Sequence, residues 1–227
     1  MKLEGINIII EKTDRRKTVS IFIERDGSVR VLAPATSSDD KIEKAIRSKQ
    51  YQIFTKLAKW KELNQGKVNR KFVNGQSFLY FGRNYRLAIV DKQDVPLKLT
   101  KGYLTLDRRK LHEAVNVFKQ FYKEKAEKKI EERVKYLVDK FQKKPSTIKV
   151  LELRNRWASW TPKQGLNFHW KCAMAPVPVL DYIITHEMVH LKYPNHSPEF
   201  WNELDKKMPD YRVHENWLKQ NGVKMAI

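Results

Sequence analysis

The spacing of hydrophobic residues predicts a β-sheet at the start of the chain. Over residues 6–34 apolar side chains alternate with polar ones, and Val19, Ile21 and Ile23 are examples. An alternation of period two is typical of strands with one buried face. The sequence "RDGS" within this stretch is typical of a hairpin turn. We therefore expect a β-rich start that contains a hairpin.

The spacing changes after Pro34, and the next segment is predicted to be a helix. "SSDD", residues 37–40, offers side chains that can cap a helix N-terminus. One helix is expected over residues 36–64, because apolar residues recur there about every three to four positions. These residues are Ile42, Ile46, Ile53, Leu57 and Trp60.

Residues 71–108 return to a strand pattern, with tight turns expected at "VNGQ" and "FGRN". A long helix is then expected over residues 109–142. Its charged middle, "KEKAEKKIEER", is expected to be a solvated face with charge pairs four residues apart. The expected buried side comprises Leu111, Val115, Phe118, Tyr122, Val134, Leu137 and Phe141.

The last part of the chain combines short strands with helices. The expected strands cover 148–153, 156–161 and 166–171, and the expected helices cover 176–193, 197–208 and 210–222. The whole pattern predicts an α+β protein with a β-rich N-terminal part, a long helix and a short second sheet. We expect two parts packed together: residues 1–108, β-rich with one helix, and residues 109–227.

Composition supports a folded protein and adds a strong positive charge. Hydrophobic residues make up 41% of the 227 residues and aromatic residues 11%, which is enough for a core. The formal net charge is +20, and residues 41–110 carry 18 lysines and arginines against 5 acidic residues, an excess of +13. This excess favours anionic partners such as nucleic acid, nucleotides or acidic proteins. A solvated, lysine-rich surface is the alternative interpretation.

The sequence lacks the patterns of membrane and secreted proteins. No stretch approaches the ~20 apolar residues of a membrane helix. The apolar run near the N-terminus is short and is broken by Asn7, so no secretory signal is expected. The single cysteine, Cys172, cannot form an internal disulfide, which favours a reducing compartment. We expect a cytoplasmic protein with no membrane partner.

The sequence "HEMVH", residues 186–190, predicts the chemistry. On a helix His186 and His190 are four positions apart and project from the same face. Two neutral imidazoles so placed can bind one zinc ion. Glu187 follows the first histidine and could act as a general base toward a water molecule that zinc activates. The motif therefore predicts a hydrolytic site with one Zn²⁺.

A catalytic zinc ion needs a third protein ligand, and His196 is the candidate. A helix that continued through this residue would turn its side chain away from His190. Pro194 removes an amide donor and disfavours helix at Tyr193, so the helix is expected to end there. The chain can then bring His196 back to the metal, and Ser197 is expected to be the N-cap of the next helix.

These residues resemble a known family. "VLDYIITHEMVHLKYPNHSPEFW", followed by "PDY" and "NWLK", is similar to the YgjP-like zinc metallopeptidases, a zincin-like family distantly similar to SprT-like proteins. The resemblance covers most of the chain, including the β-rich start, the long helix and the short sheet. It implies that His186, His190 and His196 bind zinc and that Glu187 is the catalytic acid and base. The family pattern R-W-G-S-C reads "RWASW" here, residues 156–160, so the role of this segment does not transfer.

Four further residues are candidates for contacts with a substrate or transition state. Arg156, and more weakly Arg154, could bind a carboxylate or phosphate group. Tyr211 or His214 could stabilise an oxyanion at the metal. The alternatives are a surface role for the arginines and a packing or capping role for Tyr211 and His214.

The other polar residues near the motif are expected to be structural. Asn195 or Glu199 is the expected partner of His196, whereas Asp181 does not share the face of the zinc ligands. Cys172 is expected to be a small buried residue. His112 and His169 are expected to be structural.

Three functions are compatible with this site. The first is a zinc metallopeptidase that acts on a protein or peptide. The second is a nucleotide pyrophosphatase that hydrolyses nucleoside triphosphates, an activity assigned within the YgjP-like family. The third is a DNA-associated, SprT-like protease that docks nucleic acid through the basic segment 41–110. Phosphoryl chemistry often recruits several carboxylates, and only Glu187 and Glu199 lie near the motif, so the sequence favours peptide hydrolysis.

Overall fold

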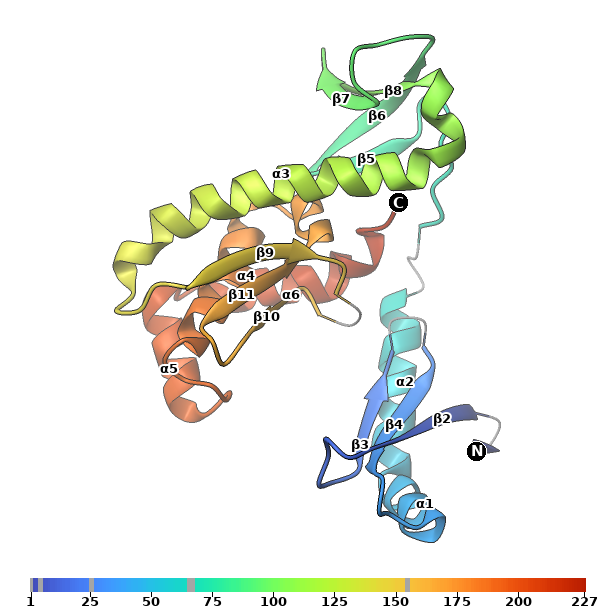
Figure 1. The fold of residues 1–227 in the computed structure, drawn as a ribbon, viewed down its shortest axis with the longest axis vertical. Helices are drawn as coiled ribbons and strands as arrows, with labels where there is room; N and C mark the ends of the chain where they lie inside the picture. Colours follow the sequence, from blue (N-terminus) through green and yellow to red (C-terminus); the bar gives the residue numbers. More distant parts are fainter. Residues whose placement is uncertain (1, 4–5, 25–26, 65–67, 154–155) are drawn as a thin grey trace. The chain divides into compact units, whose positions relative to one another are not determined.

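The chain divides into two units in the computed structural model, residues 1–66 and residues 67–227. The structure describes residues 2–3, 6–24, 27–64, 68–153 and 156–227. Helices are combined with three small sheets (Figure 1), which confirms the predicted α+β class with a β-rich start and a long helix. No helix in these described ranges is long and apolar enough to cross a membrane.

The first unit contains a sheet of order β1-β2-β4-β3. Its strands are β1 (Lys2–Leu3), β2 (Ile6–Thr13), β3 (Ser20–Ile23) and β4 (Val29–Pro34). β2 and β4 are parallel, whereas β3 and β4 form the predicted antiparallel hairpin. Residues 25–26 of its turn lie outside the described part of the chain. Gly27 has φ 86°, and a Cβ atom there would lie 2.6 Å from the ring of Trp60, so the turn requires glycine at this position.

Two helices pack on this sheet where the sequence predicts one. α1 (Asp39–Ser48) and α2 (Gln50–Asn64) are separated at Lys49, whose N–H donates to the carbonyl of Ile46 at 3.1 Å. The break changes the helix direction so that both helices place apolar residues on the same small sheet. Their shared core is Ile8, Val29, Val31, Ala33, Ile42, Ile46, Ile53 and Leu57.

The second unit begins with a sheet of order β5-β6-β8-β7. Its strands are β5 (Ser77–Tyr80), β6 (Arg83–Val90), β7 (Leu97–Thr100) and β8 (Tyr103–Asp107). The predicted turn at "FGRN" joins β5 to β6, and Phe81 and Gly82 both have positive φ, 43° and 81°. Two successive residues with positive φ are typical of the tight turns that match the twist of a hairpin.

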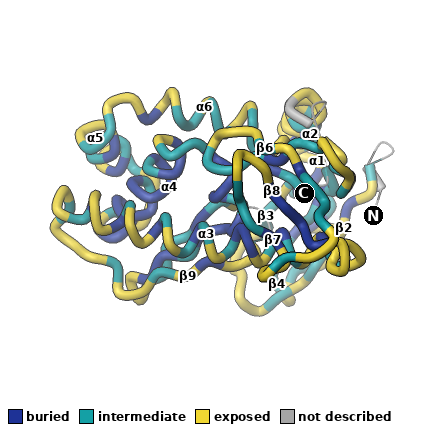
Figure 2. Tube along the Cα trace, turned by 90° about the horizontal axis from the view of Figure 1, so that it is seen from above, coloured by how far each residue is buried: buried dark blue, intermediate teal, exposed yellow. Residues whose placement is uncertain are grey.

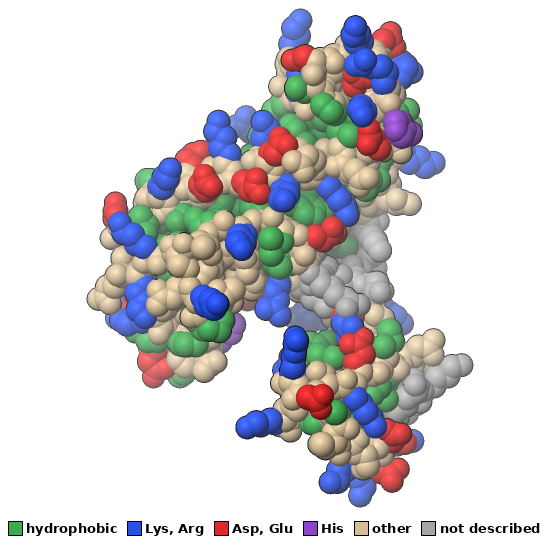
Figure 3. Space-filling model, viewed as in Figure 1, with side chains coloured by type: hydrophobic (Ala, Val, Ile, Leu, Met, Phe, Trp, Pro, Cys, Tyr) green, Lys and Arg blue, Asp and Glu red, His purple; other side chains and the backbone are tan. Residues whose placement is uncertain are grey.

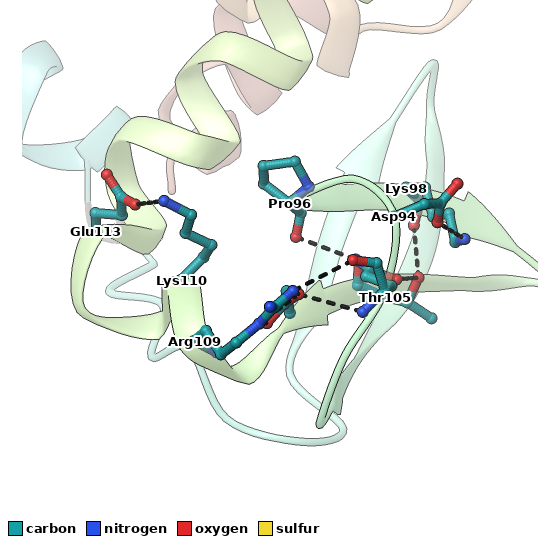
Figure 4. A network of polar contacts seen from close by, with 9 residues as sticks. Asp94, Pro96, Lys98, Thr105, Arg109, Lys110 and Glu113 are labelled. Atoms are coloured by element: carbon teal, nitrogen blue, oxygen red, sulfur yellow. Dashed lines mark hydrogen bonds and ion pairs between the residues drawn. The ribbon is translucent and has the colours of Figure 1, made fainter.

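A polar network fixes the loop between β6 and β7 (Figure 4). The side-chain amide of Gln93 donates to the carbonyl groups of Pro96 at 3.1 Å and Thr105 at 2.7 Å. The buried carboxylate of Asp107 accepts from the N–H of Gln93 at 3.2 Å and from Arg109. The hydrogen bond from Arg109 holds the pKa of Asp107 well below its usual range.

The long helix α3 (Ala114–Leu137) is shorter than the predicted helix over residues 109–142. The 3₁₀ helices η1 (Arg108–Glu113) and η2 (Val138–Lys140) precede and follow it. Leu111 and Val115 are exposed, so their predicted burial is wrong. Leu111 lies in η1 before the α-helix begins, and Val115 is one position away from Ala114, off the buried side that continues through Phe118. The buried side continues through the charged middle at Ala126 and Ile130. It comprises Phe118, Tyr122, Ala126, Ile130, Val134 and Leu137.

α3 packs against both sheets of the second unit (Figure 1). One end packs on the β5–β8 sheet, where the rings of Phe118 and Phe78 have centroids 4.5 Å apart. The hydroxyl of Tyr122 donates to the carbonyl of Leu79 at 2.7 Å. The rest of α3 packs on the second sheet and on α4. The predicted division between residues 108 and 109 lies within η1 and stays a prediction.

The second sheet has the order β10-β11-β9 and positions the metal-binding motif. Its strands are β9 (Thr147–Leu151), β10 (Ala158–Trp160) and β11 (Gly165–His169), close to the three predicted pieces. β10 is an edge strand and packs against α4 (Val177–His190). The remaining helices are η3 (Trp170–Met174), α5 (Pro198–Lys207), α6 (Tyr211–Asn221) and η4 (Gly222–Lys224).

Arg70 ties the beginning of this unit to its end. Its Nε donates to the carbonyl of Ser77 at 2.9 Å. Its Nη1 donates to the carbonyls of Lys224 at 2.9 Å and Ala226 at 2.6 Å. Met225 between them is buried in the core. The segment after η4 therefore belongs to the fold and is held beside β5.

Candidate metal centre

The helix that carries the H-E-x-x-H motif is buried on nearly all sides. α4 is drawn mostly as buried in Figure 2, and ten of its residues are buried, from Val179 to His190. Pro178 near its N-terminus suits a position whose N–H has no partner within the helix. Arg133 of α3 binds the carboxylate of Asp181 through two hydrogen bonds of 2.7 and 2.8 Å. This ion pair and the apolar surroundings fix α4 against the long helix.

The structure brings together the three histidines that the sequence predicts as ligands. His186 and His190 lie one turn apart on α4, and His196 precedes α5. Their ligand atoms all lie within 4.8 Å of one another, and the Nε2 atoms of His186 and His196 are 2.9 Å apart. Among the His, Cys, Asp and Glu side chains in the described part of the chain, these three histidines form the group that could hold a metal ion.

The helix ends three residues before the predicted end at Tyr193, and His190 takes part in ending it. α4 stops at His190, and the N–H of Tyr193 still bonds to the carbonyl of Val189 at 3.0 Å before Pro194. The Nδ1 atom of His190 donates to the carbonyl of Tyr193 at 2.9 Å. A proton on Nδ1 leaves the Nε2 lone pair free for a metal, and a backbone carbonyl is a common partner for this purpose.

Aromatic side chains of α5 hold the three imidazoles in place. The ring of Phe200, fully buried, has its centroid 4.9 Å from His186, 4.5 Å from His190 and 4.7 Å from His196. Trp201 stacks on His196 at 5.4 Å. The sequence analysis did not single out these two residues. Their position in "HSPEFW", one turn after the third histidine, is the signal that could have found them.

His186 and His190 are held in the neutral form that can bind a metal. Burial, followed by the neighbouring histidines, lowers the pKa of His186 to about 3. Burial also lowers the pKa of His190. Both are therefore neutral at pH 7, with lone pairs available. Ligands of a tetrahedral zinc ion lie roughly 3.4 Å apart at Zn–N distances of about 2.0–2.1 Å. The three side chains fit such an ion.

Glu187 lies beside this cluster in a buried position. The side chain is 7% exposed, and burial raises its pKa to about 7. Two weaker effects lower the pKa, a hydrogen bond from the backbone N–H of Trp160 and the charge of Arg156. A carboxyl group with a pKa near neutrality can accept and release a proton at physiological pH. The helix position after His186 therefore carries a buried carboxyl group whose pKa is near neutrality.

The strand β10 forms one side of the site. The indole of Trp160 stacks over His190 with ring centroids 6.3 Å apart. The backbone N–H of Trp160 donates a hydrogen bond to the carboxyl group of Glu187. Arg156 lies just before this strand and is exposed, close enough to lower the pKa of Glu187. Arg154 lies outside the described residues. Trp160 therefore covers one side of the His190 ring.

Tyr211 and His214 have partners other than the histidine cluster. Tyr211 is buried in an aromatic stack between Tyr182 at 6.5 Å and Trp201 at 5.9 Å. The Nε2 atom of His214 is 3.1 Å from the carboxylate of Asp210. These contacts favour the packing and capping alternatives. Roles in transition-state stabilisation stay predictions.

Other residues near the motif have structural contacts. Glu199 accepts a hydrogen bond of 2.5 Å from the hydroxyl of Ser197, which occupies the predicted N-cap position of α5. Cys172 is fully buried, as predicted. The Nδ1 atom of His169 accepts from the N–H of Lys171 at 3.0 Å and caps η3. His169 is therefore structural, and no role in the metal centre is required for it.

Comparison with known proteins agrees with this geometry. A family model described as YgjP-like, metallopeptidase domain, matches residues 17–221. No curated protein and no solved structure matched the chain. The match covers β3, the long helix and the whole histidine cluster, and a metallopeptidase domain is a hydrolase domain. The chain therefore belongs to the YgjP-like metallopeptidase family.

Proposed function

We propose that this protein is a zinc-dependent peptidase in which His186, His190 and His196 hold one Zn²⁺ and Glu187 is the general base. The observation that carries the proposal is the convergence of three imidazoles beside a buried carboxyl group whose pKa is near 7. Neutral imidazoles with an adjacent general base suit zinc better than Mg²⁺ or Ca²⁺, which prefer oxygen ligands. When bound, zinc supplies a Lewis acid that polarises a carbonyl group and makes water more acidic.

Glu187 moves the protons. With a pKa of about 7, ionised and protonated forms coexist at neutral pH. The ionised form takes a proton from the attacking water, and the protonated form then donates it to the leaving amine. The N–H of Trp160 holds the carboxyl group in place during both steps. Trp160 and Phe200 exclude bulk water from the sides of the imidazoles that they cover.

The edge strand β10 supports a peptide substrate. The N–H of His169 donates to the carbonyl of Trp157 at 2.7 Å, and the N–H of Thr161 donates to that of Gly165 at 2.9 Å. Along an antiparallel strand, every second residue forms backbone hydrogen bonds with its neighbour. Trp157 and Thr161 bond to β11 in this way, so the N–H and carbonyl groups of Ala158 and Trp160 point away from β11. Trp160 uses its N–H for Glu187, and Ala158 offers its N–H and carbonyl to an extended peptide.

The alternatives differ in substrate. A nucleotide pyrophosphatase would be expected to bring further carboxylates to the metal. In the described ranges the group that could hold a metal contains only histidines. Figure 3 shows lysines and arginines spread over both units on the face in view, with acidic side chains among them. That distribution favours a solvated surface over a single nucleic-acid site. The lone, buried Cys172 suits the cytoplasm.

One experiment separates the three functions. The zinc-loaded protein and its Glu187→Gln variant are assayed on an unfolded protein, a DNA-bound protein and nucleoside triphosphates. We expect cleavage of the unfolded protein, a loss on the order of 10²–10⁴-fold in the variant, and unchanged zinc content. Glu199→Gln is the matched control, because this exposed carboxylate bonds to Ser197, and it should retain activity. Undiminished cleavage by Glu187→Gln would refute the general-base role. Triphosphate hydrolysis that Glu187→Gln abolishes, without proteolysis, would establish the nucleotide alternative.

A further inference from the structure

A groove runs along the open edge of the sheet in the first unit. β3 pairs with β4 on one side, and no other strand in the described ranges pairs with it. Between β3 and the helices α1 and α2 lies a groove of about 220 Å³. We call it the edge groove. Its walls include Val19, Ile21 and Ile23 from the β3 side and Lys49, Ile53 and Lys56 from the helix side.

The backbone of β3 is available on the groove side. The N–H of Glu24 donates to the carbonyl of Ser28 at 2.9 Å, and Phe22 pairs with Arg30 in register. Hydrogen bonds to a neighbouring antiparallel strand alternate along the chain. The N–H and carbonyl groups of Ile21 and Ile23 therefore point away from β4. These two residues are among those that line the edge groove.

The side chains of the edge groove are aliphatic and incompletely covered. Val19, Ile21 and Ile23 are half-buried against the core of the unit, and Ile53 is buried at the base. The polar part of the wall is basic. Lys49 and Lys56 are both exposed, and no acidic residue is among the described residues that line the groove. The groove thus combines an open strand edge, an apolar floor and a cationic rim.

We propose that the edge groove binds an extended, acidic segment of a partner polypeptide, which adds a strand to β3. The backbone groups of Ile21 and Ile23 pair with the segment, alternate apolar side chains enter the groove, and acidic side chains meet the two lysines. A single-stranded nucleic acid would need aromatic platforms for its bases, and the floor here is aliphatic. This site goes beyond the proposed peptidase function, because it lies in the first unit and uses none of the metal-centre residues.

The test is a binding titration with the full chain. The probe is a fluorescent peptide of about eight residues in which valine and glutamate alternate, followed by fluorescence anisotropy at low salt. The protein carries Glu187→Gln, so that the metal centre does not cleave the probe. We expect saturable binding that weakens as salt rises. The double variant Lys49→Glu, Lys56→Glu should bind about tenfold more weakly or worse.

Two controls make the result specific. Lys59→Glu, Lys61→Glu reverses two exposed charges of α2 that do not line the groove, and it should bind within about twofold of the parent. A probe with N-methyl groups on alternate amides keeps its charges but loses backbone hydrogen bonds, so it should bind about tenfold more weakly. No binding at about millimolar probe, equal binding by both double variants, or equal binding of the N-methylated probe would each overturn the proposal. So would a single-stranded oligonucleotide that binds when the peptide does not.

Discussion

The buried position of Glu187 predicts a measurable cost to the stability of the metal-free protein. Burial raises the pKa of this carboxyl group from about 4.5 to about 7. Each tenfold change in a protonation constant corresponds to 1.36 kcal/mol. Ionising Glu187 at high pH therefore lowers the free energy of unfolding by about 3 kcal/mol. Glutamine has no such charge, and its side-chain oxygen can still accept the N–H of Trp160.

The sign of the effect sets the pH window. A carboxyl group whose pKa is raised in the folded state binds its proton more tightly there than in the unfolded chain. Its destabilising effect is absent below about pH 4.5, grows between about pH 4.5 and 7, and is complete above about pH 7. The Glu187→Gln variant should therefore gain stability over wild type as the pH rises from 5 to 8, by about 3 kcal/mol at the upper end.

The assay is denaturant unfolding in a metal chelator at pH 5 and pH 8, followed by tryptophan fluorescence. It reports mainly on the relevant unit, because five of the six tryptophans lie after residue 66 and only Trp60 lies in the first unit. Replacing the exposed Glu199 by glutamine is the control and should give no such gain. A gain that is the same at both pH values, or no gain at pH 8, would show that the carboxyl group is not desolvated as the structure indicates.

Three further substitutions test the packing around the site. Gly82→Ala should lower the free energy of unfolding by about 1–3 kcal/mol, because a Cβ atom at this positive φ would lie 2.8 Å from Pro176. Thermal unfolding measures this loss, and an unchanged midpoint would contradict the prediction. Asp181→Asn should cost about 1–3 kcal/mol, because Arg133 keeps its charge in a largely buried place; denaturant unfolding measures the loss. Phe200→Ala should cost about 3–5 kcal/mol and weaken zinc binding, measured by competition with a chelator; unchanged zinc affinity would show that this ring does not position the ligands.

The convergence of the three histidines can be predicted from the sequence because local rules determine most of it. The i,i+4 spacing places His186 beside His190, and Pro194, four residues later, keeps the helix from continuing. Those rules do not predict which side chains support the ligands. Phe200 comes from α5 and Trp160 from a distant strand, so their contacts depend on tertiary packing. The same limit applies to the pKa of Glu187, which depends on burial.

The helices show where periodicity is an incomplete guide. Ile42 and Ile53 are correctly predicted as apolar positions facing the core, but spacing alone does not predict the break at Lys49 between them. On the long helix, Phe118 and Tyr122 are buried as predicted, whereas Leu111 and Val115 near the start are exposed. Ala126 and Ile130 carry burial through the charged middle. Small residues give weak hydrophobic signals, although they allow elements to approach closely.

The hydrogen bonds of Arg70 have a consequence for the order in which the chain can fold. They join residues that are 154 and 156 positions apart in the sequence. Closing so long a loop is entropically slow, and the contact is impossible until residues 224–226 have been synthesised and are accessible. The first unit has its own core within residues 1–66 and meets no such delay. During synthesis the N-terminal unit can therefore become structured while the metal centre still waits for the segment that completes its unit.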